Sequence, residues 1–204
     1  MKVRNKGQIG LEIEEYKSSN KIQISIPDEI WVKHHFNKSE YNLRVAQINF
    51  NLNKDKEIIK KLENTEEIDP DFNTYEWVVI MAYYAMFHSV NALLRKIGII
   101  VGKEHSHDIT LNLLLYYFYF TKIIEDSLIE IFENTGEEAK KLISSYIYAK
   151  DERVKYQYKA DQATQEKNAK KILNGAVIFV NKLKEISTSL NKDLVLIRLG
   201  KRAL

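Results

Sequence analysis

Residues 75–97 read YEWVVIMAYYAMFHSVNALLRKI, and they are apolar nearly all the way round when wound as an α-helix. Larger side chains lie along one side of this helix, and small side chains lie along another. The larger set is Trp77, Ile80, Tyr84, Phe87, Asn91 and Leu94, and the small set is Ala82, Ala85, Ser89 and Ala92. A helix that is buried on both flanks lies in the middle of a bundle. The segment therefore predicts an all-α fold with residues 75–97 at its centre.

Both ends of this helix carry signals in the sequence. Asn73 is followed three residues later by Glu76, which resembles a capping box at the start of a helix. Gly98 stands where a left-handed residue ends a helix. The sequence thus predicts a helix that begins just after Asn73 and ends just before Gly98.

The overall composition agrees with long helices in a single sizeable domain. The 204 residues include only 7 glycines and 2 prolines, which are few turn-forming residues for a fold with many strands. The formal charge of +3 is mild, so any nucleic-acid site must be local. The chain has no cysteine, which excludes disulfides and thiolate chemistry and fits a reducing compartment.

No membrane segment or targeting segment is expected. The N-terminal residues lack the apolar core of a signal peptide. The most apolar run, residues 77–101, is interrupted by His88, Asn91, Arg95 and Lys96, which makes it a poor membrane span. We therefore expect a soluble protein of the cytoplasm with no membrane partner.

The chain divides into three parts by its patterns. Residues 1–37 are expected to form an appendage with a short extended segment that ends at Pro27, because apolar and polar residues alternate there. Residues 38–188 are expected to form the bundle, with a first helix that begins at Ser39. Residues 189–204 form a β-favouring tail that either pairs with the N-terminal segment or stays loose.

Further helices are expected after the central one. One begins at Ser106, a second covers about residues 122–133, a third begins near Glu137, and the last covers about residues 165–187. Together with the earlier segments, they predict an all-α, up-and-down helical bundle of five to six helices with a short N-terminal extended appendage.

The histidines give little support for a metal site. The chain has five, and they are His34, His35, His88, His105 and His107. None has helical metal-ligand spacing to another histidine, although His105 and His107 lie two residues apart beside two acidic residues. Ordinary loop or capping histidines are favoured over a metal site there, and a hydrogen-bonded core histidine is favoured for His88. We expect no metal and no cofactor.

Most enzyme classes lack a motif in this chain. There is no glycine-rich phosphate loop and no nucleophile elbow. The remaining candidate is the segment 151–161, DERVKYQYKAD, which concentrates cations and tyrosines. Arginine matches the geometry of phosphate, and tyrosine can stack on a base. On composition alone, a solvated helix face with charges of mixed sign is the favoured interpretation.

Three motifs together resemble the HEPN superfamily of small helical-bundle domains from prokaryotic toxin–antitoxin and defence loci. The central helix carries A-Y-Y-A-M-F at residues 82–87. Residues 104–107, EHSH, stand where a T-H-S-G-like turn is expected, and residues 153–158, RVKYQY, stand where R-x-x-A-D-Y is expected. The resemblance covers about residues 39–186, and its central-helix part is the most specific.

The resemblance implies a site around Arg153. Ribonuclease members of the superfamily carry R-x4–6-H and cut RNA without a metal across a homodimer, but this chain has Tyr158 at the histidine position. A tyrosine with an ordinary pKa near 10 is a poor general base at neutral pH. Residues five apart on a straight helix also point about 140° from each other, whereas Asp151 and Tyr158 share a stripe. Regulation through a tyrosine two positions beyond the histidine is not carried over, because Ala160 stands there.

The favoured hypothesis is a homodimeric HEPN protein that binds RNA or a nucleotide in a cleft between the two copies, with weak or absent nuclease activity. Arg153 and Tyr158 would take the roles of the family's catalytic pair and line the cleft. The residues expected to bind nucleic acid are Arg153, Lys155, Tyr156, Lys159 and His105.

Two alternatives remain open. The first is an interaction module that docks a nucleotidyltransferase or a defence-complex protein, since the bundle needs neither the N-terminal segment nor the tail. The second is an active, metal-independent endoribonuclease, in which Tyr158 donates a hydrogen bond or His105 supplies the missing base.

Overall fold

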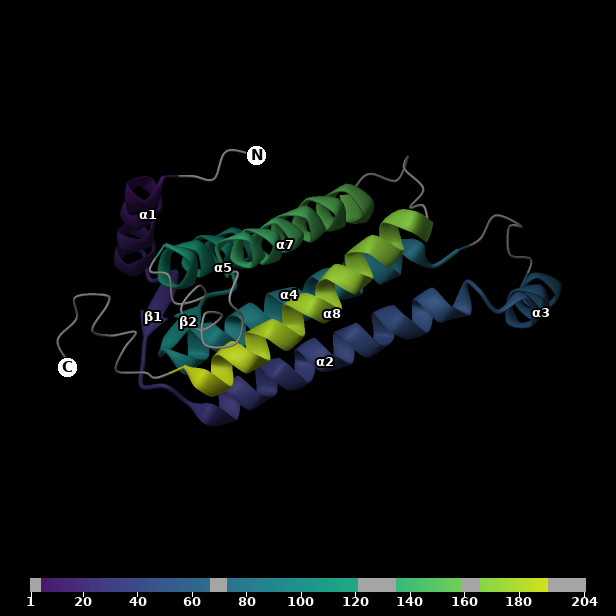
Figure 1. The fold of residues 1–204 in the computed structure, drawn as a ribbon, viewed down its shortest axis with the longest axis horizontal. Helices are drawn as coiled ribbons and strands as arrows, with labels where there is room; N and C mark the ends of the chain where they lie inside the picture. The colour runs from purple at the N-terminus through teal and green to yellow at the C-terminus, as the bar shows by residue number, and fades with distance from the viewer. Residues whose placement is uncertain (1–4, 67–72, 121–134, 159–165, 191–204) are drawn as a thin grey trace.

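The computed structural model describes residues 5–66, 73–120, 135–158 and 166–190 (Figure 1). Its elements in chain order are α1 (Lys6–Ser18), β1 (Ile22–Ile24), α2 (Glu29–Leu52), α3 (Lys56–Glu66), α4 (Tyr75–Lys96), β2 (Ile99–Val101), α5 (Ser106–Leu114), the π-helix η1 (Leu115–Tyr119), α7 (Thr135–Tyr158) and α8 (Glu166–Ser189). Four long helices, α2, α4, α7 and α8, run side by side, and α1 and the small sheet lie at one end (Figure 1). The prediction of an all-α helical bundle is confirmed.

Helix α4 lies at the centre of the bundle, as its sequence predicts. It packs against α2, α7 and α8 and also contacts α5. All four residues of its small set are fully buried. On this side the Ser39 hydroxyl of α2 donates a hydrogen bond of 2.7 Å to the backbone oxygen of Ala85. The small residues therefore bring two helix backbones into close contact.

The larger side of α4 is buried only in part. Ile80, Asn91 and Leu94 are buried, but Tyr84 and Phe87 are half-buried and Trp77 is 54% exposed. The expectation that this whole side fills the core is wrong at Trp77.

The tight contact at Ala85 gives a test of the fold. Ala85→Leu should lower the free energy of unfolding by about 2 to 3 kcal/mol, because three added carbons have no space beside Ser39. Met81→Leu is the control, since Met81 is half-buried on the same helix and this swap costs less than about 1.5 kcal/mol. Urea unfolding measures both variants. Equal stability of Ala85→Leu and the wild type would contradict the close packing.

The start of α4 differs from the predicted capping box. The N-cap is Thr74, one residue after Asn73. Thr74 is tied to the end of α2, because its backbone N–H donates to Asn53 Oδ1 at 2.7 Å and its hydroxyl donates to the Asn49 carbonyl at 3.0 Å. Asn73 accepts a longer hydrogen bond of 3.3 Å from the backbone of Tyr75. Contacts with α2, rather than a local capping box, fix where α4 begins.

The N-terminal part is more helical than predicted. Residues 6–18 form α1, and α2 begins at Glu29 rather than at Ser39. Asp28 caps α2 by accepting a hydrogen bond of 2.8 Å from the backbone of Ile30, so the acidic residue that follows Pro27 starts the helix. Helix α2 is thus continuous across the expected boundary between residues 37 and 38. The division of the chain into three parts stays a prediction.

The extended segment before Pro27 is confirmed as β1, and its partner, β2, is a strand that the sequence did not predict. Strand β2 lies antiparallel to β1, with Ile22 opposite Val101 and Ile24 opposite Ile99. Residues 191–204 of the tail and the helix expected at residues 122–133 lie outside the described residues. The expected helices near Ser106, Glu137 and residue 165 correspond to α5, α7 and α8.

One helix of the described chain is long and apolar enough to cross a membrane by length and composition. It is α4, and 72% of its most apolar window is buried inside the bundle. This burial is typical of the core helix of a soluble protein.

Candidate functional site

Arg153 of α7 points into the bundle and lies against two tyrosines of α4. Its side chain is 6% exposed. Its Nη2 donates a hydrogen bond of 3.2 Å to the hydroxyl of Tyr84. The guanidinium carbon lies 5.5 Å from the ring centre of Tyr83 and 5.4 Å from that of Tyr84, which are cation–π distances. The A-Y-Y-A-M-F segment of α4 therefore positions the arginine.

A pocket of about 320 Å³ opens beside Arg153. It lies between α7, the first turn of α5 and the residues just before α5. Its lining residues are Lys103, His105, Ser106, His107, Asp108, Lys150, Arg153 and Val154. The structure thus brings Arg153 and His105, which are both predicted site residues, to one pocket.

An ion pair joins the two walls of this pocket. Lys150 Nζ of α7 lies 2.5 Å from Asp108 Oδ1 in the first turn of α5. Three lysine and arginine side chains, Lys103, Lys150 and Arg153, line the pocket against one carboxylate. The lining therefore carries a formal charge of +2 when its histidines are neutral.

His105 holds the turn before α5 in an unusual backbone conformation. It is the N-cap of α5, and its φ of 51° is left-handed. Histidine tolerates this region better than most residues, but such a conformation costs of order 1 kcal/mol or more and concentrates at functional sites. Ser106 and His107, the first two residues of α5, line the pocket, so the backbone N–H groups at the helix N-terminus border it. These N–H groups and the helix dipole favour an anion.

His107 lies in the same wall and belongs to the aromatic cluster that surrounds Arg153. Its Nδ1 is 2.8 Å from the hydroxyl of Tyr83, and its ring centre is 4.6 Å from that of Phe87. Burial, followed by the positive charges of Arg153 and Lys150, lowers the pKa of His107 to about 4. The imidazole is therefore neutral at pH 7, and its Nδ1 is engaged by the tyrosine.

The other predicted site residues of α7 are not placed in this pocket. Lys155 does not line it, and its Nζ lies 4.0 Å from Glu152 of its own helix. Tyr156 and Tyr158 belong to α7, but their side chains lie outside the described part of the structure, and so does all of Lys159. Because α7 is a helix through Tyr158, a regular geometry would put that residue about 140° around the axis from Arg153.

Sequence reasoning missed three residues on α4 and α5 and one on α7 itself. Tyr83, Tyr84, His107 and Lys150 all contact or border Arg153 or its pocket. The two tyrosines were visible as part of the α4 motif, but a helix pattern alone assigns them to the core. Only the packing of α4, α5 and α7 shows that they meet at one arginine.

A second pair of histidines lies on the partly exposed side of α4. His35 of α2 and His88 of α4 face each other with their Nδ1 atoms 3.4 Å apart, and both are half-buried. Burial is the main cause that lowers the pKa of His35 to about 3 and that of His88 to about 4. His88 is thus a hydrogen-bonded histidine of the bundle, as its sequence position predicts.

These lowered pKa values predict how stability depends on pH. In the unfolded chain these histidines bind protons below a pKa of about 6.5, whereas in the folded chain His35 and His88 bind them only near pH 3 to 4. The unfolded state therefore binds more protons between pH 6.5 and 4, and the free energy of unfolding should fall as the pH is lowered through this range. Urea unfolding at several pH values measures it. A His35→Gln, His88→Gln variant should lose stability less steeply, and an unchanged slope in that variant would contradict the assignment.

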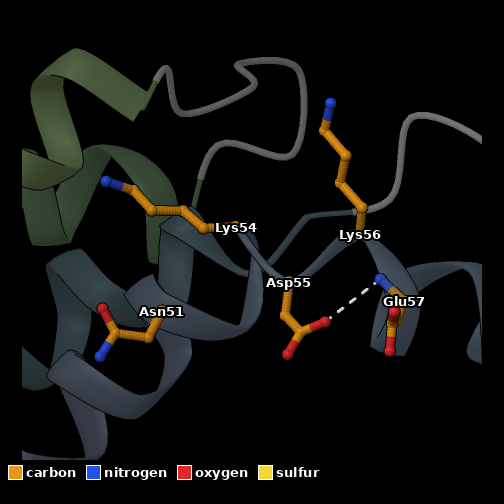
Figure 2. Close-up of a pocket in the computed structure, with 5 residues that line it drawn as sticks. All are labelled: Asn51, Lys54, Asp55, Lys56 and Glu57. Carbon is orange, nitrogen blue, oxygen red and sulfur yellow. Dashed lines mark hydrogen bonds between the residues drawn. The ribbon is translucent and has the colours of Figure 1, made fainter.

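A second pocket lies at the turn between α2 and α3 and does not have the features of a site. Its lining residues are Asn51, Lys54, Asp55, Lys56 and Glu57. Figure 2 shows that the two lysine side chains extend outward and do not converge with Asp55. Asp55 is used locally, since its Oδ1 accepts a hydrogen bond of 3.1 Å from the backbone of Glu57 (Figure 2). This pocket is a feature of the turn that starts α3.

Comparison with known proteins agrees with the motifs on α4 and α7. The family model described as the HEPN domain matches residues 60–186, which is more than half of the chain and includes α4, α5 and Arg153. A search of curated proteins found no match. The chain therefore belongs to the HEPN domain family.

Proposed function

We propose that this HEPN-domain protein binds the phosphate of RNA or of a nucleotide in the pocket beside Arg153. The observation that carries the proposal is the fixed guanidinium at the pocket wall, held by the hydroxyl of Tyr84 and by the rings of Tyr83 and Tyr84. An arginine that is already held in place loses little side-chain entropy when it binds a phosphate.

The rest of the pocket suits an anion. Lys103 and Lys150 add positive charge, and the first turn of α5 adds backbone N–H donors. Because Arg153 is only 6% exposed, a phosphate would reach it through the pocket rather than from the outer surface of α7. Its neighbours then contribute the long-range attraction, and Arg153 contributes the directed hydrogen bonds.

The wider biological role follows from the family and is part of the proposal. A homodimer in which two such pockets face each other, in a toxin–antitoxin or defence system of the cytoplasm, is the setting that we infer. Docking of a nucleotidyltransferase or a defence-complex protein stays an alternative role. Sedimentation of the purified protein over a range of concentrations tests the dimer.

A charge reversal at the pocket rim tests phosphate binding. Lys103→Glu should weaken the binding of a labelled single-stranded RNA by about five- to tenfold, because it places a negative charge beside the phosphate. Fluorescence anisotropy measures the affinity at salt concentrations from about 50 to 200 mM, over which phosphate binding should weaken. Lys155→Glu is the matched control, since Lys155 lies on α7 but does not line the pocket. Equal losses in both variants would argue for unspecific attraction to the whole surface.

A second candidate function is favoured by the position of His107. For the active endoribonuclease, the sequence places tyrosine rather than histidine at position 158, and it offered His105 as a replacement base. In the structure a neutral imidazole, His107, and a guanidinium, Arg153, contact the same two tyrosines and line the same pocket. Such a base could take the proton of a 2′-hydroxyl while the arginine stabilises the charge on the phosphate.

RNA cleavage in EDTA tests this second candidate. Cleavage that is lost in both His107→Ala and Arg153→Ala, and kept in His105→Ala, would support it. If no RNA substrate is cleaved in a way that depends on Arg153, the endoribonuclease function is excluded. With a pKa of about 4 for His107, the rate should stay flat from pH 8 down to about 5 and fall only below that.

A further inference from the structure

A continuous band of aromatic and imidazole rings leads from the Arg153 pocket along α4 to the start of α2. We call the five residues Trp31, His34, His35, Tyr84 and His88 the ring band. Trp31 lies 5.1 Å from His34 and 6.4 Å from His35, measured between ring centres. His35 lies 5.6 Å from His88, and His88 lies 6.5 Å from Tyr84, the tyrosine that binds Arg153.

The exposed members of the band lie at the end far from the pocket. Trp31 is 44% exposed, and His34 is exposed as well. His35, His88 and Tyr84 are half-buried and lie between Trp31 and Arg153 in the band. Trp31 and His34 thus place two exposed rings next to each other at one end of the band.

Positively charged side chains lie at both ends of the ring band and near its middle. Arg95 lies over the Trp31 ring, with its guanidinium carbon 5.1 Å from the ring centre. Lys38 lies close enough to both His35 and His88 to lower their pKa values. Arg153 stands at the other end. Glu29, two positions before Trp31 in α2, pairs with Lys96 at 2.6 Å, so its charge is offset.

The protonation state of His35 and His88 decides the charge in the middle of the band. Because the pKa values of His35 and His88 are about 3 and 4, both rings are neutral at pH 7. At neutral pH the band therefore consists of uncharged rings with cations at its two ends and beside its middle. Stacking of bases on rings, combined with cations for the backbone, is how proteins bind single-stranded nucleic acid without reading its sequence.

We propose that the ring band is a binding track for single-stranded RNA, in which bases stack on Trp31 and His34 while a phosphate of the same strand occupies the Arg153 pocket. This inference rests on the proposed function and extends it, because it predicts a ligand several nucleotides long rather than a mononucleotide. A site of about four or more nucleotides is common for such tracks.

The observations favour RNA over a protein partner for this surface. A protein partner would be expected to cover the most exposed aliphatic side chains of α2, which are Ile30 at 79% and Ile48 at 66% exposure. Neither belongs to the ring contacts of the band. The band is instead made of flat rings and cations, which complement bases and phosphates.

The two tryptophans of the chain give a direct test. Trp77→Phe leaves Trp31 as the only tryptophan, and Trp31→Phe leaves Trp77, which is 54% exposed on α4 and has no part in the band. Each full-length variant is titrated with uridine monophosphate and with uridine oligonucleotides of three, six and nine residues. We expect Trp31 fluorescence to be quenched by the longer oligonucleotides and not by the monophosphate, and Trp77 fluorescence to stay unchanged.

Affinity measurements complete the test. Trp31→Ala should weaken binding of the nonamer by about tenfold and leave binding of the monophosphate unchanged, whereas Trp77→Ala should change neither. A different outcome is that Arg153→Ala weakens RNA binding while Trp31 fluorescence is not quenched and Trp31→Ala keeps full affinity. That result would contradict the binding track and would still support the phosphate pocket. If Arg153→Ala has no effect either, the proposed function itself fails.

One further outcome would overturn the track. If Trp31 becomes shielded as the protein concentration rises without RNA, and sedimentation shows association over the same range, then a second copy of the chain covers the ring band. Dilution of the Trp77→Phe variant, followed by fluorescence and sedimentation, separates this outcome from RNA binding.

Discussion

Arg153→Ala should weaken the binding of single-stranded RNA by about tenfold to a hundredfold, which corresponds to the loss of a charged hydrogen bond at a fixed site. The guanidinium is the group that the structure holds in place at the pocket wall, through Tyr84 and through the ring of Tyr83. Removing it leaves the lysines of the pocket rim and the N-terminus of α5 but no guanidinium to bind the phosphate. Anisotropy with a labelled oligonucleotide at low salt measures the change.

Two variants make this result interpretable. Lys155→Ala removes a positive charge from the same helix outside the pocket and should change the affinity less than about twofold. Arg153→Lys keeps the charge but loses the planar fork and the stacking on the tyrosines, so it should recover only part of the affinity. Circular dichroism and urea unfolding show whether each variant is folded. Full RNA affinity in a folded Arg153→Ala protein would contradict the proposed site.

Among glycine-to-alanine substitutions in the described chain, Gly98→Ala should be the most destabilising. It should lower the free energy of unfolding by at least about 3 kcal/mol. Gly98 has a left-handed φ of 78°, and a Cβ there would lie 2.1 Å from the backbone oxygen of Ser25. A backbone atom cannot move aside as a flexible side chain can. Ser25 is also bonded to this residue, since its N–H donates to the Gly98 carbonyl at 2.7 Å.

Gly175→Ala is the matched control for this prediction. Gly175 lies inside α8, and a Cβ there would meet nothing closer than Ser145 Cβ at 3.7 Å, an ordinary contact distance. Alanine is the better helix former, so this variant should gain about 0.5 to 1 kcal/mol. Urea unfolding of both variants should move the midpoints in opposite directions. A Gly98→Ala protein with wild-type stability would contradict the close approach of β1 to the end of α4.

The sequence predicts the fold well where the pattern is local. The periodicity of residues 75–97 predicts the central helix, and Gly98 marks its end through its backbone conformation. The sequence predicts the start of α4 less well, because contacts of Thr74 with Asn49 and Asn53 of α2 determine it. The same holds for the sheet, where the partner of β1 is β2 and the two segments are far apart in the chain.

The candidate site could be predicted only in part. Arg153 and His105 were singled out by their motifs, and the structure brings both to one pocket. His107 and Lys150 could not be assigned, because their roles depend on how α5 packs against α7. Lys155 looked equivalent to Arg153 in composition, but two positions along a helix turn a side chain by about 200°. A cluster of cations in sequence is therefore divided between a pocket and an outer surface.

The most direct test of the central claim is a structure of the protein bound to a short single-stranded RNA. We expect a phosphate oxygen within hydrogen-bonding distance of the Arg153 guanidinium, in the pocket formed by α5 and α7 and beside His105 and Lys103. An RNA bound elsewhere, with the Arg153 pocket empty and its guanidinium still packed on Tyr83 and Tyr84 alone, would contradict the claim. In that case Arg153 would serve only to hold α7 against α4.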